Sequence, residues 1–172
     1  YGYTDVWQVE DIVSKYEAAG IPLDTQWMDI DYMQYYRDFT SDPTNFPIDE
    51  VSKFVGELHS NGQHFVQIID PGVQQVENYE AYSEGVDLDI FVKDLTGIPY
   101  LGQVWPGPTA FPDFTHPNTP GYWKGQIQDY HDQVALDGLW IDMNEISNFC
   151  NVDGNGQTCK NSAPGGCPVP SA

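Results

Sequence analysis

The feature that most constrains this chain is an alternation of amphipathic helices with short apolar segments that end in aspartate. Apolar residues at helical spacing predict helices over residues 4–19 and 48–62, each ended by a glycine. The short apolar runs at 23–31, 64–70 and 138–143 predict strands. Helices that alternate with strands in this way are typical of a parallel sheet with right-handed crossovers.

This alternation is compatible with two α/β architectures, a doubly wound sheet and a (β/α)8 barrel. Neither G-x-G-x-x-G nor G-x-x-x-x-G-K-[ST] occurs, which weakens the nucleotide-binding folds and favours the barrel. A complete barrel takes about 250 residues. This chain has 172, with three predicted strands and the end of a fourth at residues 1–3. We therefore expect an α/β fold that is the first half of a (β/α)8 TIM barrel.

Residues 71–117 interrupt the alternation, and we expect an inserted hairpin and loop region there, after the third strand. The runs 89–94 and 98–105 flank a Leu-Thr-Gly turn and predict the hairpin. The run 104–114, rich in proline, glycine and aromatic residues, predicts an ordered loop. The alternation then resumes with a helix expected over residues 120–136.

The C-terminal tail contains all the cysteines of the chain: Cys150, Cys159 and Cys167. Clustered cysteines in a Gly-, Asn- and Pro-rich loop indicate a disulfide formed in an oxidising compartment, so we expect a secreted protein, with a vacuole or lysosome as alternatives. A zinc site is less favoured, because the spacings lack a C-x2-C pair and no histidine is near. The odd number leaves one thiol free or paired with another chain. The expected division is residues 1–149 as the barrel part and 150–172 as a loop leading into the missing second half.

The charge of the chain restricts its partners. Asp and Glu number 26 against 6 Lys and Arg, a net charge of −20. Such a chain repels phosphates and anionic lipid, so neither nucleic acid nor a membrane is expected as a partner, whereas neutral polar ligands are compatible. The first residues include no initiator Met and no signal-like segment, so we expect a piece of a longer polypeptide.

Carboxylates stand at the end of each predicted strand: Asp29 and Asp31, Asp70, and Asp142. In α/β sheets and barrels this edge is where ligands bind. Residues two apart point to one face of a strand, so Trp27, Ile68 and Trp140 each share a face with an acid. Acids beside aromatic rings suit sugars, since carboxylates accept hydrogen bonds from hydroxyls and rings stack on pyranose C–H faces.

Each of these residues has a structural alternative when taken singly. An aspartate at a strand end is commonly a helix cap or a turn former. Trp140 and Trp105 taken singly are more often core residues than ligand walls. Three strands that end in the same way favour a site.

The run WIDMNEISNF at residues 140–149 resembles the nucleophile signature of family 31 glycoside hydrolases, the retaining α-glucosidases. The similarity covers nearly the whole chain, through PLDTQWMDIDYMQYYRDFT, FPIDEVSKFVGELHSNGQ, IIDPG and YLGQVWPGPTAFPDFTHP, and only the cysteine-bearing tail is distinctive. WMDIDYM resembles the maltase and acid α-glucosidase type, as in secreted fungal and plant enzymes, more than the endoplasmic-reticulum trimming glucosidase.

The resemblance implies roles for particular residues. Asp142 would be the catalytic nucleophile and Glu145 a supporting acid near it. Asp29 would hold hydroxyls of the bound glucose, with Asp31 and Asp70 close behind. The remaining expected substrate-binding residues are apolar or aromatic: Ile30, Ile68, Trp105, Trp140, Met143 and Tyr1. No cofactor and no metal are expected.

The family's general acid/base and its pocket arginine and histidine have no counterpart in these 172 residues. The expected partners are therefore an oligosaccharide substrate and the remaining part of the same enzyme, which would supply the acid/base. The resemblance implies an exo-acting α-glucosidase that hydrolyses terminal α-linked glucose from maltose-type oligosaccharides. Other family 31 activities remain open (α-xylosidase, transglucosylase, α-glucan lyase), as does a non-catalytic carbohydrate-binding chain.

Overall fold

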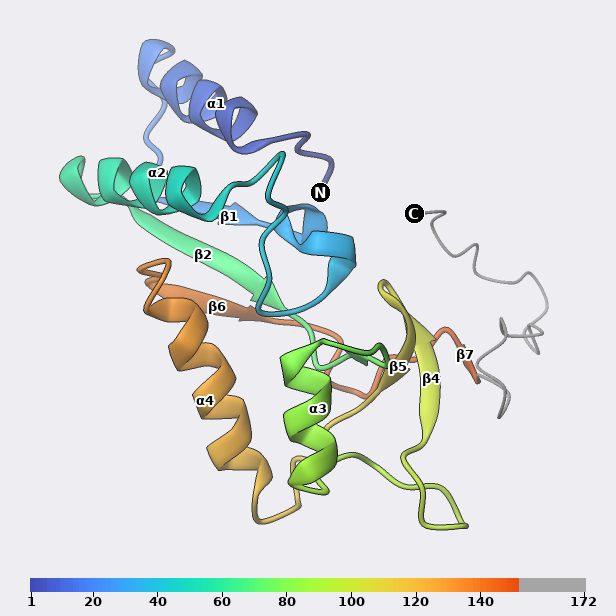
Figure 1. The fold of residues 1–172 in the computed structure, drawn as a ribbon. Coiled ribbons are helices and arrows are strands. Elements are labelled where there is room, and N and C mark those ends of the chain that lie inside the picture. The colour runs from blue at the N-terminus through green and yellow to red at the C-terminus, as the bar shows by residue number, and fades with distance from the viewer. Residues whose placement is uncertain (152–172) are drawn as a thin grey trace. The chain divides into compact units, whose positions relative to one another are not determined.

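A computed structural model describes residues 1–151 (Figure 1). The described chain forms two compact units. Cys159 and Cys167 lie outside it, and every pairing of the three cysteines includes one of them, so the predicted disulfide lies outside the described residues. Unit 1 comprises Tyr1–Ile69 and Ile127–Asp142, and unit 2 comprises Asp70–Gln126 and the described residues 143–151.

Unit 1 is built on a three-stranded sheet of β1 (Thr25–Met28), β2 (His64–Ile69) and β6 (Gly138–Ile141). The strands are parallel in the order β1-β2-β6, as Figure 1 shows, so the three predicted strands and their parallel arrangement are confirmed. Residues 1–3 form no strand. The insertion therefore follows the second of the described strands.

Two helices of unit 1 match the predicted segments, α1 (Val6–Ala18) and α2 (Ile48–Ser60). The side chain of Asp5 caps α1 by accepting the N–H of Gln8 at 2.8 Å. Chain reversal after α2 uses Gly62, whose φ of +73° lies in the left-handed region that glycine adopts without steric cost. The apolar stripe of α2 is buried and consists of Val51, Phe54, Val55 and Leu58.

The two faces of the unit 1 sheet differ in how they are covered. On one face Phe65 packs edge-on against Phe54 of α2, with ring centroids 5.9 Å apart. The opposite face carries an open, mostly apolar hollow lined by Thr25, Trp27, Val66 and Trp140. Within the described residues of unit 1 this face has no helix packed on it comparable to α2. Parallel strands of a complete barrel are covered on both faces. The open face of this sheet therefore agrees with a partial barrel.

Asp137, directly before β6, connects the amino-terminal ends of β2 and β6. Its carboxylate accepts the N–H of Phe65 at 2.7 Å and lies 2.8 Å from Nε2 of His59 and 3.3 Å from Nδ1 of His64. Burial raises the pKa of Asp137, but the hydrogen bonds from Phe65 and the two histidines outweigh burial and hold it below its ordinary value. The ionised form of Asp137 therefore stabilises the fold.

We predict that Asp137→Asn lowers the free energy of unfolding at pH 7 by about 1–2 kcal/mol, because charge-assisted hydrogen bonds become neutral ones. A depressed carboxyl pKa contributes stability above the ordinary value of about 3.9, and this contribution is lost as pH falls through the folded-state pKa. The gap between the two proteins should thus close in acid. Thermal unfolding from pH 7 to pH 3 measures it, with the exposed acid Asp129→Asn as control. A gap that stays constant over this range contradicts the prediction.

Unit 2 contains an antiparallel sheet in the order β3-β5-β4-β7. Its strands and helix are β3 (Val73–Gln74), α3 (Glu80–Asp87), β4 (Leu101–Val104), β5 (Gly107–Ala110) and β7 (Cys150–Asn151). Strands β4 and β5 form a hairpin whose two-residue loop is Trp105-Pro106.

The structure confirms the turn of the predicted hairpin and corrects the extent of its pairing. The run 104–114, expected to be a loop, contains β5, and β5 rather than residues 89–94 pairs with β4. Pairing across the Leu-Thr-Gly turn is present, because Asp94 donates its N–H to the carbonyl of Ile98 at 2.9 Å and Tyr100 donates its N–H to the carbonyl of Val92 at 2.7 Å. It amounts to isolated bridges rather than a strand, from Lys93 to Pro99 and from Phe91 to Pro112. Both bridge partners are prolines, which have no N–H to continue a ladder.

Helix α3 was not predicted, and α4 (Thr119–His131) is shorter than the expected 120–136. Only eight residues long, α3 contains Gly85, where a Cβ would lie 2.6 Å from Cε2 of Phe91. Glycine here permits close packing at a cost in helix propensity, which weakens the helical pattern. Among the described residues no helix is long and apolar enough to cross a membrane.

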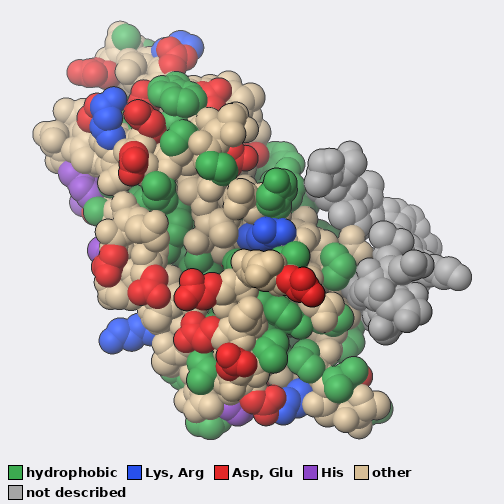
Figure 2. All heavy atoms as spheres, in the orientation of Figure 1, with side chains coloured by type: hydrophobic (Ala, Val, Ile, Leu, Met, Phe, Trp, Pro, Cys, Tyr) green, Lys and Arg blue, Asp and Glu red, His purple; other side chains and the backbone are tan. Residues whose placement is uncertain are grey.

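The acid excess of the sequence is visible on the surface. On the face drawn in Figure 2, acidic side chains are spread widely among few and separate basic ones. This distribution agrees with a net charge of −20 and with the expectation of a neutral ligand.

Candidate active site

The carboxyl edge of the unit 1 sheet carries two of the predicted site acids. Asp29 follows the last residue of β1, and Asp142 follows the last residue of β6. Strand β2 lies between these strands, and Trp27 pairs with Val66 while Ile68 pairs with Trp140. The parallel order therefore brings both acids to the same edge of one sheet, as the sequence pattern predicts.

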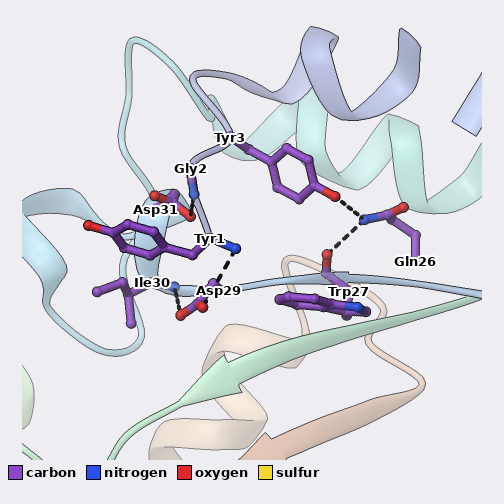
Figure 3. A network of polar contacts seen from close by, with 8 residues as sticks. All are labelled: Tyr1, Gly2, Tyr3, Gln26, Trp27, Asp29, Ile30 and Asp31. Atoms are coloured by element: carbon purple, nitrogen blue, oxygen red, sulfur yellow. Dashed lines mark hydrogen bonds and ion pairs between the residues drawn. The ribbon is translucent and has the colours of Figure 1, made fainter. Parts of the chain in front are cut away.

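Both carboxylate oxygens of Asp29 contact backbone nitrogens. Its Oδ1 accepts the N–H of Ile30 at 2.7 Å and so caps the short 3-10 helix η1 (Ile30–Tyr32). Its Oδ2 lies 3.7 Å from the backbone nitrogen of Tyr1, as Figure 3 shows. The capping alternative is thus observed. Capping occupies Oδ1, and a ligand role for this carboxylate stays a prediction.

Asp31 belongs to the same turn and binds the N-terminal segment. Its Oδ2 accepts the N–H of Gly2 at 3.0 Å (Figure 3). Burial raises the pKa of Asp31 above its ordinary value, and the nearby charge of Asp29 adds to the increase, while the Gly2 hydrogen bond opposes it. Asp31 is therefore a supporting residue beneath the segment that carries Tyr1, which is itself exposed.

Two predicted pocket residues of unit 1 are almost fully covered. Ile30 and Ile68 are each 2% exposed. Tyr32 donates its hydroxyl to the carbonyl of Ile68 at 2.7 Å, which fixes η1 to the end of β2. Both isoleucines are therefore packed residues at the carboxyl edge, and direct contact with a ligand stays a prediction.

The aromatic members of the unit 1 face are more accessible. Trp140 is half-buried, and its ring meets Trp27 edge-on with centroids 5.1 Å apart. Trp27 is 44% exposed. The two rings lie on the uncovered face of the sheet, on the side that strand alternation predicts for Asp29 and Asp142.

The other predicted site residues belong to unit 2. Trp105 donates Nε1–H to Sδ of Met143 at 3.0 Å, so these two predicted pocket residues are in contact. Asp70 is 5% exposed, and Glu145 is exposed. Asp142 itself is half-buried and follows Ile141, which is 76% exposed.

Sequence patterns did not single out two residues that hold the site segments in place. Tyr32 fixes η1 to β2, and Asn148 binds β4 next to Gly102. A signal existed for the second, because a glycine within a strand marks a close approach of another group. No periodic pattern identifies Tyr32, since a hydroxyl that meets a backbone carbonyl 36 residues away leaves no mark in the local sequence.

Parallel strands, crossover helices and aspartates at the carboxyl edge define a domain of the (β/α)8-barrel class, in which ligands bind at that edge. Residues 1–168 match the glycosyl hydrolases family 31 TIM-barrel domain, and the chain belongs to this family.

The curated relatives include fungal and plant proteins. The chain is 45% identical over 150 residues to an alpha-glucosidase of Mucor javanicus and 50% identical over 149 residues to a probable alpha-glucosidase of Oryza sativa subsp. japonica. Each alignment covers 87% of this chain but 17% of the relative. The chain therefore spans about a sixth of these proteins.

Solved structures give the same fold. The family 31 alpha-glucosidase of Bacteroides thetaiotaomicron superposes with a TM-score of 0.76 at 38% identity, covering 86% of this chain and 24% of that one. The catalytic subunit of ER glucosidase II in its heterodimeric complex superposes with a TM-score of 0.81 at 30% identity, covering 87% and 16%.

Proposed function

We propose that this chain is the nucleophile-bearing part of a retaining, exo-acting α-glucosidase that releases terminal glucose from maltose-type oligosaccharides. The observation that carries the proposal is the place of Asp142, directly after β6 on the edge of the sheet that also carries Asp29. The names of the fungal and plant relatives support an α-glucosidase.

In the proposed reaction Asp142 acts as an ionised carboxylate. It attacks the anomeric carbon while a second, protonated carboxyl group gives its proton to the leaving oxygen, and a covalent glucosyl ester forms. Water, deprotonated by the second group, then cleaves the ester with overall retention. In retaining enzymes the two carboxyl groups lie about 5–5.5 Å apart.

The proposal assigns the acid/base to a part of the enzyme outside these 172 residues. Asp29 and Asp142 share one edge, so their charges repel unless a cation comes near. Arg37 is the one arginine in the sequence, and its guanidinium lies 5.1 Å from the ring centroid of Tyr35. We therefore assign the neutralising charge of the pocket to the remaining part as well.

The first anomer released tests the proposal. In the complete enzyme, NMR of maltose hydrolysis should show α-glucose before mutarotation, and maltotriitol should yield glucose and maltitol because cleavage occurs at the non-reducing end. Retention follows from two successive inversions at the anomeric carbon.

Other products contradict the proposal in distinct ways. Initial β-glucose would indicate an inverting enzyme, and anhydrofructose would indicate a lyase. Faster cleavage of an α-xyloside than of the matched α-glucoside would indicate a xylosidase. Binding of maltose without turnover would indicate a non-catalytic carbohydrate-binding chain.

A further inference from the structure

The segment that follows Asp142 is held on β4 by a side chain. Asn148 Oδ1 accepts the N–H of Gln103 at 2.9 Å, and its Nδ2 donates to the hydroxyl of Tyr100 at 3.3 Å. The next residue, Phe149, donates its N–H to the carbonyl of Gln103 at 3.0 Å. The Asn148 amide thus continues the β4–β7 pairing toward Asp142 by a side-chain hydrogen bond.

Gly102 is the residue that makes room for this amide. A Cβ at this position would lie 2.7 Å from Cγ of Asn148 and 2.7 Å from Cε2 of Phe111. Real Cβ atoms do not approach heavy atoms this closely, and Phe111 is 2% exposed, so its ring has little space to move. Glycine weakens a strand interior, and here the close approach of Asn148 explains its presence.

The beginning of the segment is fixed as well. Met143 has a φ of +61°, a left-handed conformation that is uncommon for a residue other than glycine. Its Sδ accepts Nε1–H of Trp105, and its carbonyl accepts the N–H of Ser147 at 3.1 Å. The Trp105 ring also meets Phe149 edge-on, with centroids 4.9 Å apart. Unusual backbone conformations persist where surrounding contacts determine them, and they gather at functional sites.

We propose that Asn148 is a positioning residue for Asp142. This proposal rests on the proposed function, in which Asp142 is the nucleophile. Met143 is bonded directly to Asp142, so the direction of the Asp142 carboxylate depends on the backbone angles of the 142–143 junction. Asn148, seated against Gly102, holds residues 143–149 in a tight turn and thereby fixes one side of that junction.

The test measures formation of the covalent intermediate rather than turnover alone. In the complete enzyme, a 5-fluoroglucosyl fluoride traps the nucleophile, and the trapped residue is located by peptide mass mapping. Asn148→Ala should trap about 10–100-fold more slowly, the scale expected when a reacting group is misplaced by about 1 Å. The inhibition constant for glucose should change less than about 3-fold, because binding of the ground state does not depend on the direction in which the Asp142 carboxylate attacks.

Two variants separate positioning from general damage. Asn148→Asp keeps an acceptor for the Gln103 N–H and should recover most of the trapping rate. Asn118→Ala is the matched control in unit 2, since it also truncates an asparagine that bonds the backbone through its side chain, from Nδ2 to the carbonyl of Leu88 at 3.2 Å. It should trap at the wild-type rate.

The outcomes for the two proposals are distinguishable. Wild-type labelling at a residue other than Asp142 overturns the proposed function. Labelling at Asp142 with a wild-type rate in Asn148→Ala overturns the positioning role and leaves the function intact. If Asn148→Ala does not fold, Asn148→Leu decides, because it keeps the shape of the side chain but offers no acceptor to the Gln103 N–H: slower trapping supports positioning, and a wild-type rate overturns it.

Discussion

Asp142→Ala is expected to lower kcat for maltose by about four orders of magnitude or more, because the covalent route has no other nucleophile at this position. Substrate binding should survive, since hydroxyl recognition is assigned to other residues of the edge. The measurement is kcat on an activated aryl α-glucoside and on maltose, with thermal unfolding to show that the fold persists. The half-buried position of Asp142 after β6 makes a small side chain tolerable there.

An external nucleophile provides the decisive control. Azide can enter the space left by the carboxylate and attack the same face of the sugar, so Asp142→Ala with azide and an activated α-glucoside should form β-glucosyl azide. Asp129→Asn, on the exposed side of α4, should retain wild-type kcat. Full activity of Asp142→Ala, or rescue that gives the α-azide, would remove Asp142 from the role of nucleophile.

The parts of the fold that local periodicity encodes were predictable. Helix α2 has an unbroken apolar stripe and a glycine at its end, and β2 is a compact apolar run ending in Asp70. Parallel pairing then followed from the alternation of helices with strands. Each of these features depends on contacts that a regular element makes along one face, so a short stretch of sequence contains the information.

The strands of the insertion were harder to predict, because their pairing is non-local and the sequence there is rich in proline. Residues 89–94 have a strand-like composition and pair across the predicted turn, but only through isolated bridges to Pro99 and Pro112. The turn at Trp105-Pro106 produces a further hairpin, of β4 and β5, within a run whose composition predicts a loop. Proline does not separate the two cases, because β5 itself contains Pro108, which pairs with Gln103. The composition of this region therefore does not report which segments form a ladder.

In the candidate site, too, some features follow from the local sequence and others depend on non-local pairing. Acids at the ends of β1 and β6 reach one edge because parallel strands run in the same direction, which the sequence predicts. The contact between Gly102 and Asn148 joins residues 46 apart and depends on the exact register of β4. Registers of irregular antiparallel strands are weakly specified by composition, so this contact required the structure.

Asp29→Asn should lower kcat/KM for maltose by about 100–1000-fold while leaving thermal stability nearly unchanged, because a half-buried charged acceptor for sugar hydroxyls is worth several kcal/mol and asparagine still caps a helix. The side chain caps η1 through the N–H of Ile30, and the asparagine Oδ1 can accept the same hydrogen bond. The measurement combines steady-state kinetics with thermal unfolding, and it separates the ligand role from the capping role at one residue.

Asp5→Asn is the matched control for this change. Asp5 caps α1 in the same unit by accepting the N–H of Gln8. Asp5→Asn therefore makes the same chemical change at a helix cap, but away from the carboxyl edge of the sheet. It should leave both kcat/KM and stability close to wild type. If Asp29→Asn behaves like Asp5→Asn in the kinetic assay, Asp29 is a cap and the hydroxyl-binding acid lies elsewhere. A large kinetic loss with an unchanged melting temperature assigns the Asp29 carboxylate to the substrate.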